Sequence, residues 1–342
     1  MRKYLLPENG QFYKANLHCH TTISDGTKTP QEIKQMYINN GYSVVAYTDH
    51  DVFAHHDYLN DSNFLALHGT EIQIDESRSD DKPRSQYKTC HLCFIAIDPD
   101  TNKHPWKYHS VFYNRSTGEL KGDTSFLENE YSHPRIYSHE CINEIIKTAR
   151  DKGFFVTYNH PTWSLQDSSD FMYYENLCAM EITNYNCIVG GYFDYNPRVY
   201  DEMLRDHKKL YCIAADDNHN RSKDSFGGFT VIKADKLEYR SITDALVNGN
   251  FYASQGPIIN ALWYEDGHVH IECENAKEIY YSTARTMGYA KRSVDANGID
   301  CADFPVDPFD IYFRITVVDF DNNIANTNAY FVDDIIVGGA QL

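Results

Sequence analysis

Pairs of histidine and carboxylate recur along the first 219 residues at spacings that suit metal binding. An H-x-H motif places His18 and His20 at i and i+2. Alternate side chains of a strand share one face, so both imidazoles of this motif can hold one ion. A D-x-H motif repeats the spacing with Asp217 and His219. Together the two motifs predict a metal site built from imidazole nitrogens and carboxylate oxygens.

Five further candidate ligands stand beside the ends of apolar segments: Asp25, His50, Glu71, His91 and His160. Glu71 is the natural bridge between two ions, because the two oxygens of a carboxylate can each bind one. Asp49 or Asp51 is expected to bond the far ring nitrogen of His50 and fix its tautomer. For Asp51 the preferred interpretation is a loop cap.

The other ten of the 16 histidines have no such setting. His68 lies inside an apolar run and is expected in the core rather than in the metal site. The remainder include His55, His56, His104, His109 and His268.

Seven apolar runs read as buried strands that position these residues. Helical patterns alternate with several runs, and the clearest one begins at a Thr29 cap followed by Pro30, with Glu32 completing a capping box. Strands alternating with helices predict a largely parallel α/β sheet, and seven of them predict an incomplete (β/α)7 barrel of the TIM type with ligands at its strand ends. The runs are 13–20, 43–48, 65–74, 89–97, 154–159, 179–183 and 210–215.

The segment 98–137 is polar and too long for an ordinary connection, so it is expected to be a lid, a binding loop or a surface insertion. Basic residues near the predicted site are candidates for binding a substrate phosphate. Arg78, Arg84 and Arg221 are the leading candidates, and Lys88 and Arg135 are weaker ones.

The character of the chain changes after about residue 250, where short alternating strand patterns are separated by Asp, Asn and Gly turns. This pattern predicts a small β-sandwich. The domains are therefore expected at 1–257 and 258–342. Residues 250–342 hold 5 basic and 14 acidic side chains, so this segment is not expected to bind nucleic acid or phosphate.

The whole chain of 342 residues has a formal net charge of -18, which disfavours sequence-independent binding of nucleic acid. The nine cysteines are expected to be reduced and mostly buried. The sequence contains neither a signal-peptide pattern nor a long apolar run, so we expect no membrane association and a cytoplasmic protein, or an exported one if a signal is missing. The oligomeric state is left open.

The ordered set of nine ligands resembles the PHP (polymerase and histidinol phosphatase) family of metal-dependent phosphoesterases over about residues 12–257, with an added C-terminal β-rich domain. The resemblance implies a distorted seven-stranded barrel with two or three divalent ions, which would be Zn, Mn or Fe. It implies one ion among His18, His20, Glu71 and Asp217, a second at Glu71, His91 and His160, and a third at Asp25, His50 and His219.

Such a site would hydrolyse a small-molecule phosphate ester, nucleotide-like or a sugar phosphate, with a metal-bridging hydroxide as the nucleophile. Glu71, Asp217 and His160 are the expected catalytic residues. Three alternatives stay open: a metal-dependent amide or lactone hydrolase, a polymerase-associated proofreading module, and a non-catalytic metal- or carbohydrate-binding protein.

Overall fold

All seven predicted strands form in the computed structural model, which describes residues 2–77, 82–106 and 134–336. They are β2 (Gln11–Asn16), β3 (Val44–Tyr47), β4 (Leu65–Asp75), β5 (Thr89–Ala96), β6 (Phe154–Asn159), β7 (Ala179–Asn184) and β8 (Tyr211–Ala215). Two strands follow them: β9 (Phe229–Ala234), which the sequence reading missed, and β10 (Phe251–Ser254), at the start of the region where strand patterns were expected.

Helices lie between the strands and begin where the predicted caps place them. Thr29 caps α1 with a full capping box, in which Glu32 accepts from the Thr29 N–H at 2.8 Å. None of the described helices has the length and apolar character needed to cross a membrane. The α-helices are α1 (Pro30–Asn39), α2 (His139–Asp151), α3 (Ser168–Phe171), α4 (Tyr185–Val189), α5 (Pro197–Arg205), α6 (Tyr239–Val247) and α7 (Val332–Ile336), and the 3-10 turns are η1 (Asp57–Leu59) and η2 (Arg84–Gln86).

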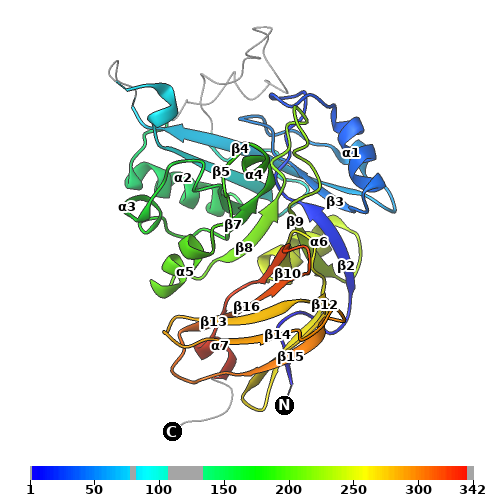
Figure 1. The fold of residues 1–342 in the computed structure, drawn as a ribbon. Coiled ribbons are helices and arrows are strands. Elements are labelled where there is room, and N and C mark those ends of the chain that lie inside the picture. Colours follow the sequence, from blue (N-terminus) through cyan, green and yellow to red (C-terminus); the bar gives the residue numbers. More distant parts are fainter. Residues whose placement is uncertain (1, 78–81, 107–133, 337–342) are drawn as a thin grey trace.

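The strands form one mixed sheet with the order β9-β2-β3-β4-β5-β6-β7-β8, visible in the upper part of the molecule (Figure 1). The prediction of a largely parallel sheet is wrong at β5, which is antiparallel to both β4 and β6. Among the described residues, the link from β4 to β5 holds only η2, so no α-helix carries the chain back across the sheet to start β5 in parallel.

The sheet does not close into the predicted barrel. Its ladder stops at β8, and in the described part of the chain the segment beyond β8 pairs with the segment beyond β2 through the isolated bridge Cys19–Asn218 rather than through a strand ladder. At this junction β9 starts against the end of β8, and a Cβ on Gly228 would lie 2.5 Å from the carbonyl oxygen of Ala215. Glycine permits this close approach, but the approach makes no strand ladder.

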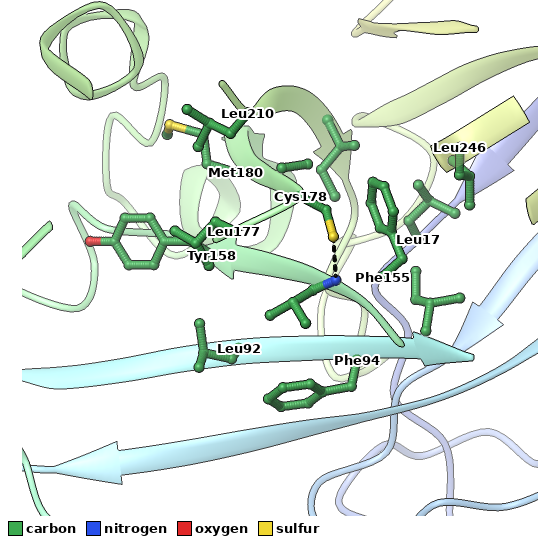
Figure 2. Packing of buried hydrophobic residues seen from close by; sticks show 14 of the residues in the cluster. Leu17, Leu92, Phe94, Phe155, Tyr158, Leu177, Cys178, Met180, Leu210 and Leu246 are labelled. Carbon is green, nitrogen blue, oxygen red and sulfur yellow. Dashed lines mark hydrogen bonds between the residues drawn. The ribbon is translucent and has the colours of Figure 1, made fainter. Parts of the chain in front are cut away.

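Apolar side chains from the strands and the segments between them make the core of this part. Leu92 and Phe94 of β5 face side chains of β6 and of the segment that enters β7 (Figure 2). The Cys178 thiol accepts a hydrogen bond from the Val156 N–H at 3.1 Å, which ties that segment to β6. This packing holds the strand ends rigidly at one edge of the sheet.

The C-terminal strands form two layers below this sheet (Figure 1). One layer has the order β1-β11-β12-β15, and the other runs β14-β13-β16-β17 and continues through β17 into β10. Both layers contribute to one apolar cluster, as expected for a β-sandwich. The strands are β1 (Lys3–Tyr4), β11 (Ile259–Glu265), β12 (His268–Ala276), β13 (Glu278–Thr283), β14 (Tyr289–Arg292), β15 (Ile299–Pro305), β16 (Tyr312–Val318), β17 (Ile324–Thr327) and β18 (Tyr330–Phe331).

Candidate metal centre

The nine predicted ligands gather at one edge of the mixed sheet. His18 and His20 follow β2, His50 follows β3, and Glu71 lies in β4. His91 stands near the start of β5, and the reversed direction of that strand brings its start to the edge where its neighbours end. The remaining ligands are Asp25, in the loop between β2 and α1, His160, which follows β6, and Asp217 and His219, which follow β8.

Four of these side chains converge on one point. Nε2 of His18 lies 3.1 Å from Nε2 of His20, and the two nitrogens lie 3.2 and 3.0 Å from Oδ1 of Asp217. Glu71 approaches the same two nitrogens at 3.4 and 3.3 Å. Two ligand atoms held about 2.1 Å from one tetrahedral ion would lie about 3.4 Å apart. The observed spacing therefore fits a shared cation.

A second group surrounds the other side of Glu71. Its Oε1 lies 2.8 Å from Nδ1 of His91 and 3.4 Å from Nε2 of His160. Cys93 lies close to His18 and Glu71 and accepts a hydrogen bond from the Asn159 side chain. The sequence reading missed Cys93, although the i and i+2 rule already places it on the same strand face as His91.

A third group lies toward the solvent. Oδ1 of Asp25 is 3.3 Å from Nε2 of His219 and 3.7 Å from Nε2 of His50, and His20 completes the group. The Nδ1 atom of His50 reaches Glu71 at 3.0 Å. Within the described residues, Oδ1 of Asp25 and Nε2 of His91 are buried without a hydrogen-bond partner, as expected of atoms that would bind a cation.

The electrostatics of the cluster favour positive charge. Burial lowers the pKa of His20, but hydrogen bonds to Asp217 and Glu71 outweigh it and bring that pKa to about 10. Burial raises the pKa of Glu71, yet His18, His91 and His50 outweigh it and hold this pKa well below its ordinary value. The carboxylates thus stay ionised, and protonated histidines balance their negative charge. Divalent cations bound at the same place would balance that charge more effectively.

Glu181 of β7 supports the cluster from beneath and was missed by the sequence reading. Its Oε1 lies 2.6 Å from Nδ1 of His18, and its Oε2 accepts from the His160 N–H at 3.0 Å and from the Asn184 side chain at 3.0 Å. Asn184 also donates to Asp217 at 3.2 Å. A glutamate alone inside an apolar strand was the available signal, since a buried charge needs partners.

Two acidic residues next to His50, Asp49 and Asp51, contact groups other than its ring. Asp49 accepts from the N–H groups of Thr21 and Ser24 at 2.8 and 2.9 Å and so shapes the loop that carries Asp25. Asp51 pairs with Arg135. The expectation that one of them orients the His50 ring is wrong, because Glu71 and Asp25 are the carboxylates that face it.

Two of the ligands adopt left-handed backbone conformations, with φ of 53° at Asp217 and 30° at His160. Such conformations cost about 1–3 kcal/mol in a non-glycine residue. Strain at these two positions is typical of residues whose side-chain direction matters more than local stability.

A cavity of about 660 Å³ opens on the cluster. Arg221 lines it and donates to the Asp25 carbonyl at 2.5 Å, so this predicted substrate-binding residue does reach the site. Lys88 instead pairs with Asp167 and Asp170 at 2.9 and 2.6 Å.

Among the other predicted phosphate-binding residues, Arg135 is the one whose side chain is described. Arg135 is directed toward Asp51. Arg78 lies outside the described residues, as does most of the expected lid (107–133), and only the backbone of Arg84 is described, in η2.

Comparison with known proteins gives structural likenesses at low sequence identity. No family model matches the chain, and no curated protein matches it. A Bacteroides vulgatus structure, described as a two-domain protein containing a predicted PHP-like metal-dependent phosphoesterase, is similar over 96% of this chain and 98% of its own, with 13% identity and a TM-score of 0.43.

Two further solved structures are similar over a smaller part of the chain. A candidate metal-dependent phosphoesterase from Bifidobacterium adolescentis shares 18% identity over 64% of this chain and 90% of its own, with a TM-score of 0.38. An amidohydrolase from Chromobacterium violaceum with bound sulfate shares 15% identity over 61% and 89%, with a TM-score of 0.35.

Proposed function

We propose that this protein is a metal-dependent phosphoesterase that hydrolyses a small-molecule phosphate ester. The observation that carries the proposal is the convergence of six imidazoles and three carboxylates at one sheet edge, beneath a cavity of about 660 Å³. The three groups of ligands support two or three divalent ions, for which Zn, Mn or Fe suit the mixture of nitrogen and oxygen donors. We also propose that the enzyme acts in the cytoplasm.

Divalent ions in this site would supply an activated water and neutralise the charge of a phosphoryl group. The protein's share is positioning. Glu71 joins the first two groups, because its Oε1 faces His18 as well as His91 and His160. Asp217 lies against both His18 and His20. His160, which also lines the cavity, is placed to contact a substrate. We therefore assign Glu71, Asp217 and His160 as the catalytic residues.

The wall of the cavity supports a substrate that carries a ring, such as a nucleotide-like or sugar phosphate. Trp163 is 38% exposed and lies with its ring centre 5.1 Å from that of His160. Tyr87 and Tyr192 also line the cavity. Exposed aromatic rings beside a polar centre bind flat or cyclic groups by stacking. Arg221 is the one basic residue among the described lining residues, which favours a monoester over a polyphosphate.

The test is a panel of phosphate esters and a panel of amides and lactones, assayed on one preparation loaded with Mn or Zn and analysed for metal content. We expect turnover of phosphate monoesters, with monoesters of ring-bearing alcohols preferred over glycerol phosphate. Turnover of amides or lactones alone would replace the proposal with a carbonyl hydrolase. Bound metal without turnover in either panel would favour a binding protein.

A further inference from the structure

A second cluster of possible metal ligands lies outside the centre described above. The loop between β3 and β4 carries His55 and Asp57, and β4 carries His68 three residues before Glu71. Residues an odd number apart point to opposite faces of a strand. His68 accordingly contacts Tyr239 of α6, with ring centres 5.1 Å apart, whereas Glu71 faces the catalytic cluster.

The three side chains of this cluster also converge, with their ligand atoms within 4.8 Å of one another. Nε2 of His68 lies 3.1 Å from Oδ1 of Asp57, and Nδ1 of His55 lies 3.8 Å from Oδ2. The rings of the two histidines have centres 4.2 Å apart, the separation that His20 and His219 show in the main centre. Each of the three residues can thus offer one ligand atom to a common point.

The placement of His68 suits a ligand. Its side chain is fully buried. Its Nε2 atom already faces the Asp57 carboxylate, and an imidazole nitrogen in that position is an ordinary ligand for a divalent transition metal. His55 and Asp57 are exposed, with 36% and 61% of their side chains accessible, so an ion can enter and retain water.

We propose that His55, Asp57 and His68 form a second site for one divalent transition-metal ion, separate from the catalytic centre. Two imidazoles and one carboxylate suit Zn and similar ions, with the remaining coordination position left to water. The ion would clip the loop to β4. Because this loop begins at His50 and Asp51, the clip would also steady one ligand of the main centre.

The experiment is zinc binding by equilibrium dialysis and elemental analysis of the full chain. His55→Ala should bind one zinc ion fewer than the wild type, and zinc should raise its melting temperature less. His55 is exposed, so the variant should fold, and circular dichroism would check this. His268→Ala removes another exposed histidine, from β12, and should bind as much zinc as the wild type.

A second background separates this site from the catalytic one. In Glu71→Gln, which disables the main centre, adding His55→Ala should still remove one further zinc ion. Equal zinc contents of His55→Ala and the wild type would overturn the proposal, and so would an equal loss in His268→Ala. In either case the Asp57–His68 hydrogen bond would be a purely structural contact.

Discussion

The strand-end edge of the N-terminal sheet and the interior of the C-terminal sandwich are both buried, but one is built from charged side chains and the other from apolar ones. The edge buries ionised groups such as Glu71 and Asp217, and holds Asp217 and His160 in strained backbone conformations. The sandwich buries aliphatic side chains such as Ile271 and Ile315 between two layers. The contrast teaches that the charged edge destabilises the fold in order to hold its side chains in place, whereas the sandwich stabilises the fold by burying apolar surface.

Glu71→Gln should have the largest effect. The substitution removes the negative charge that faces His18, His91 and His50. We expect the loss of at least one metal ion and a fall in turnover of about 10³-fold, the scale seen when a group that stabilises developing charge is removed. Metal analysis and steady-state kinetics check this. Normal metal content in the variant would break the assignment of Glu71 as the bridge.

Ile315→Ala tests the other side of the comparison. Ile315 is fully buried in β16, and its truncation should lower the free energy of unfolding by about 2–5 kcal/mol. The folded variant should keep its metal content. Urea denaturation measures the loss, and Val294→Ala, at a residue that is 99% exposed, is the matched control with no expected change. Loss of metal from folded Ile315→Ala would show that the two regions are coupled.

Glu181→Gln should weaken metal binding about 10- to 100-fold, because a carboxylate that bonds a ligating histidine orients the ring and raises its basicity. Glu181 is thus a positioning residue for His18. Competition with a chelator measures the change in affinity. Glu175→Gln, at an exposed glutamate paired with Lys208, is the control. A drop in stability with unchanged metal affinity would give Glu181 a structural role only.

Asp194→Asn should have the smallest effect, and it should stabilise the metal-free protein rather than impair it. Burial raises the pKa of Asp194 from 3.8 to about 6, although His160 and the Asn196 side chain lower it. Above pH 6 the folded protein therefore holds a charge that the unfolded chain carries more easily, and this penalty disappears as the pH falls from 6 to below 4.

We expect Asp194→Asn to stabilise metal-free protein by about 1–2 kcal/mol at pH 7.5, less than the full effect of the pKa shift because the amide accepts more weakly. Near pH 3.5 the gain should vanish. Unfolding curves at the two pH values provide the measurement. A variant that is less stable at pH 7.5 would show that Asp194 contributes through its bonds to Trp163 and Asn196 instead.

Much of the site was predictable because its determinants are local. The alternation of side chains along a strand placed His18 beside His20, and the structure brings their Nε2 atoms to 3.1 Å from each other. The cap at Thr29 likewise needs only residues within one helical turn. Strand direction was not predictable in the same way, because it depends on how the chain returns across the sheet. The reversed β5 and the open sheet were therefore missed.

The sequence by itself determined which residues can bind metal and which elements carry them, since residue chemistry and hydrophobic periodicity are properties of short segments. Only the tertiary structure decided which distant residues meet. It put Glu181 under His18 across 163 positions of chain and brought His55 toward His68. The physical reason is that a buried charge or a neutral imidazole finds its partner through packing of whole strands, and no spacing along the chain records that packing.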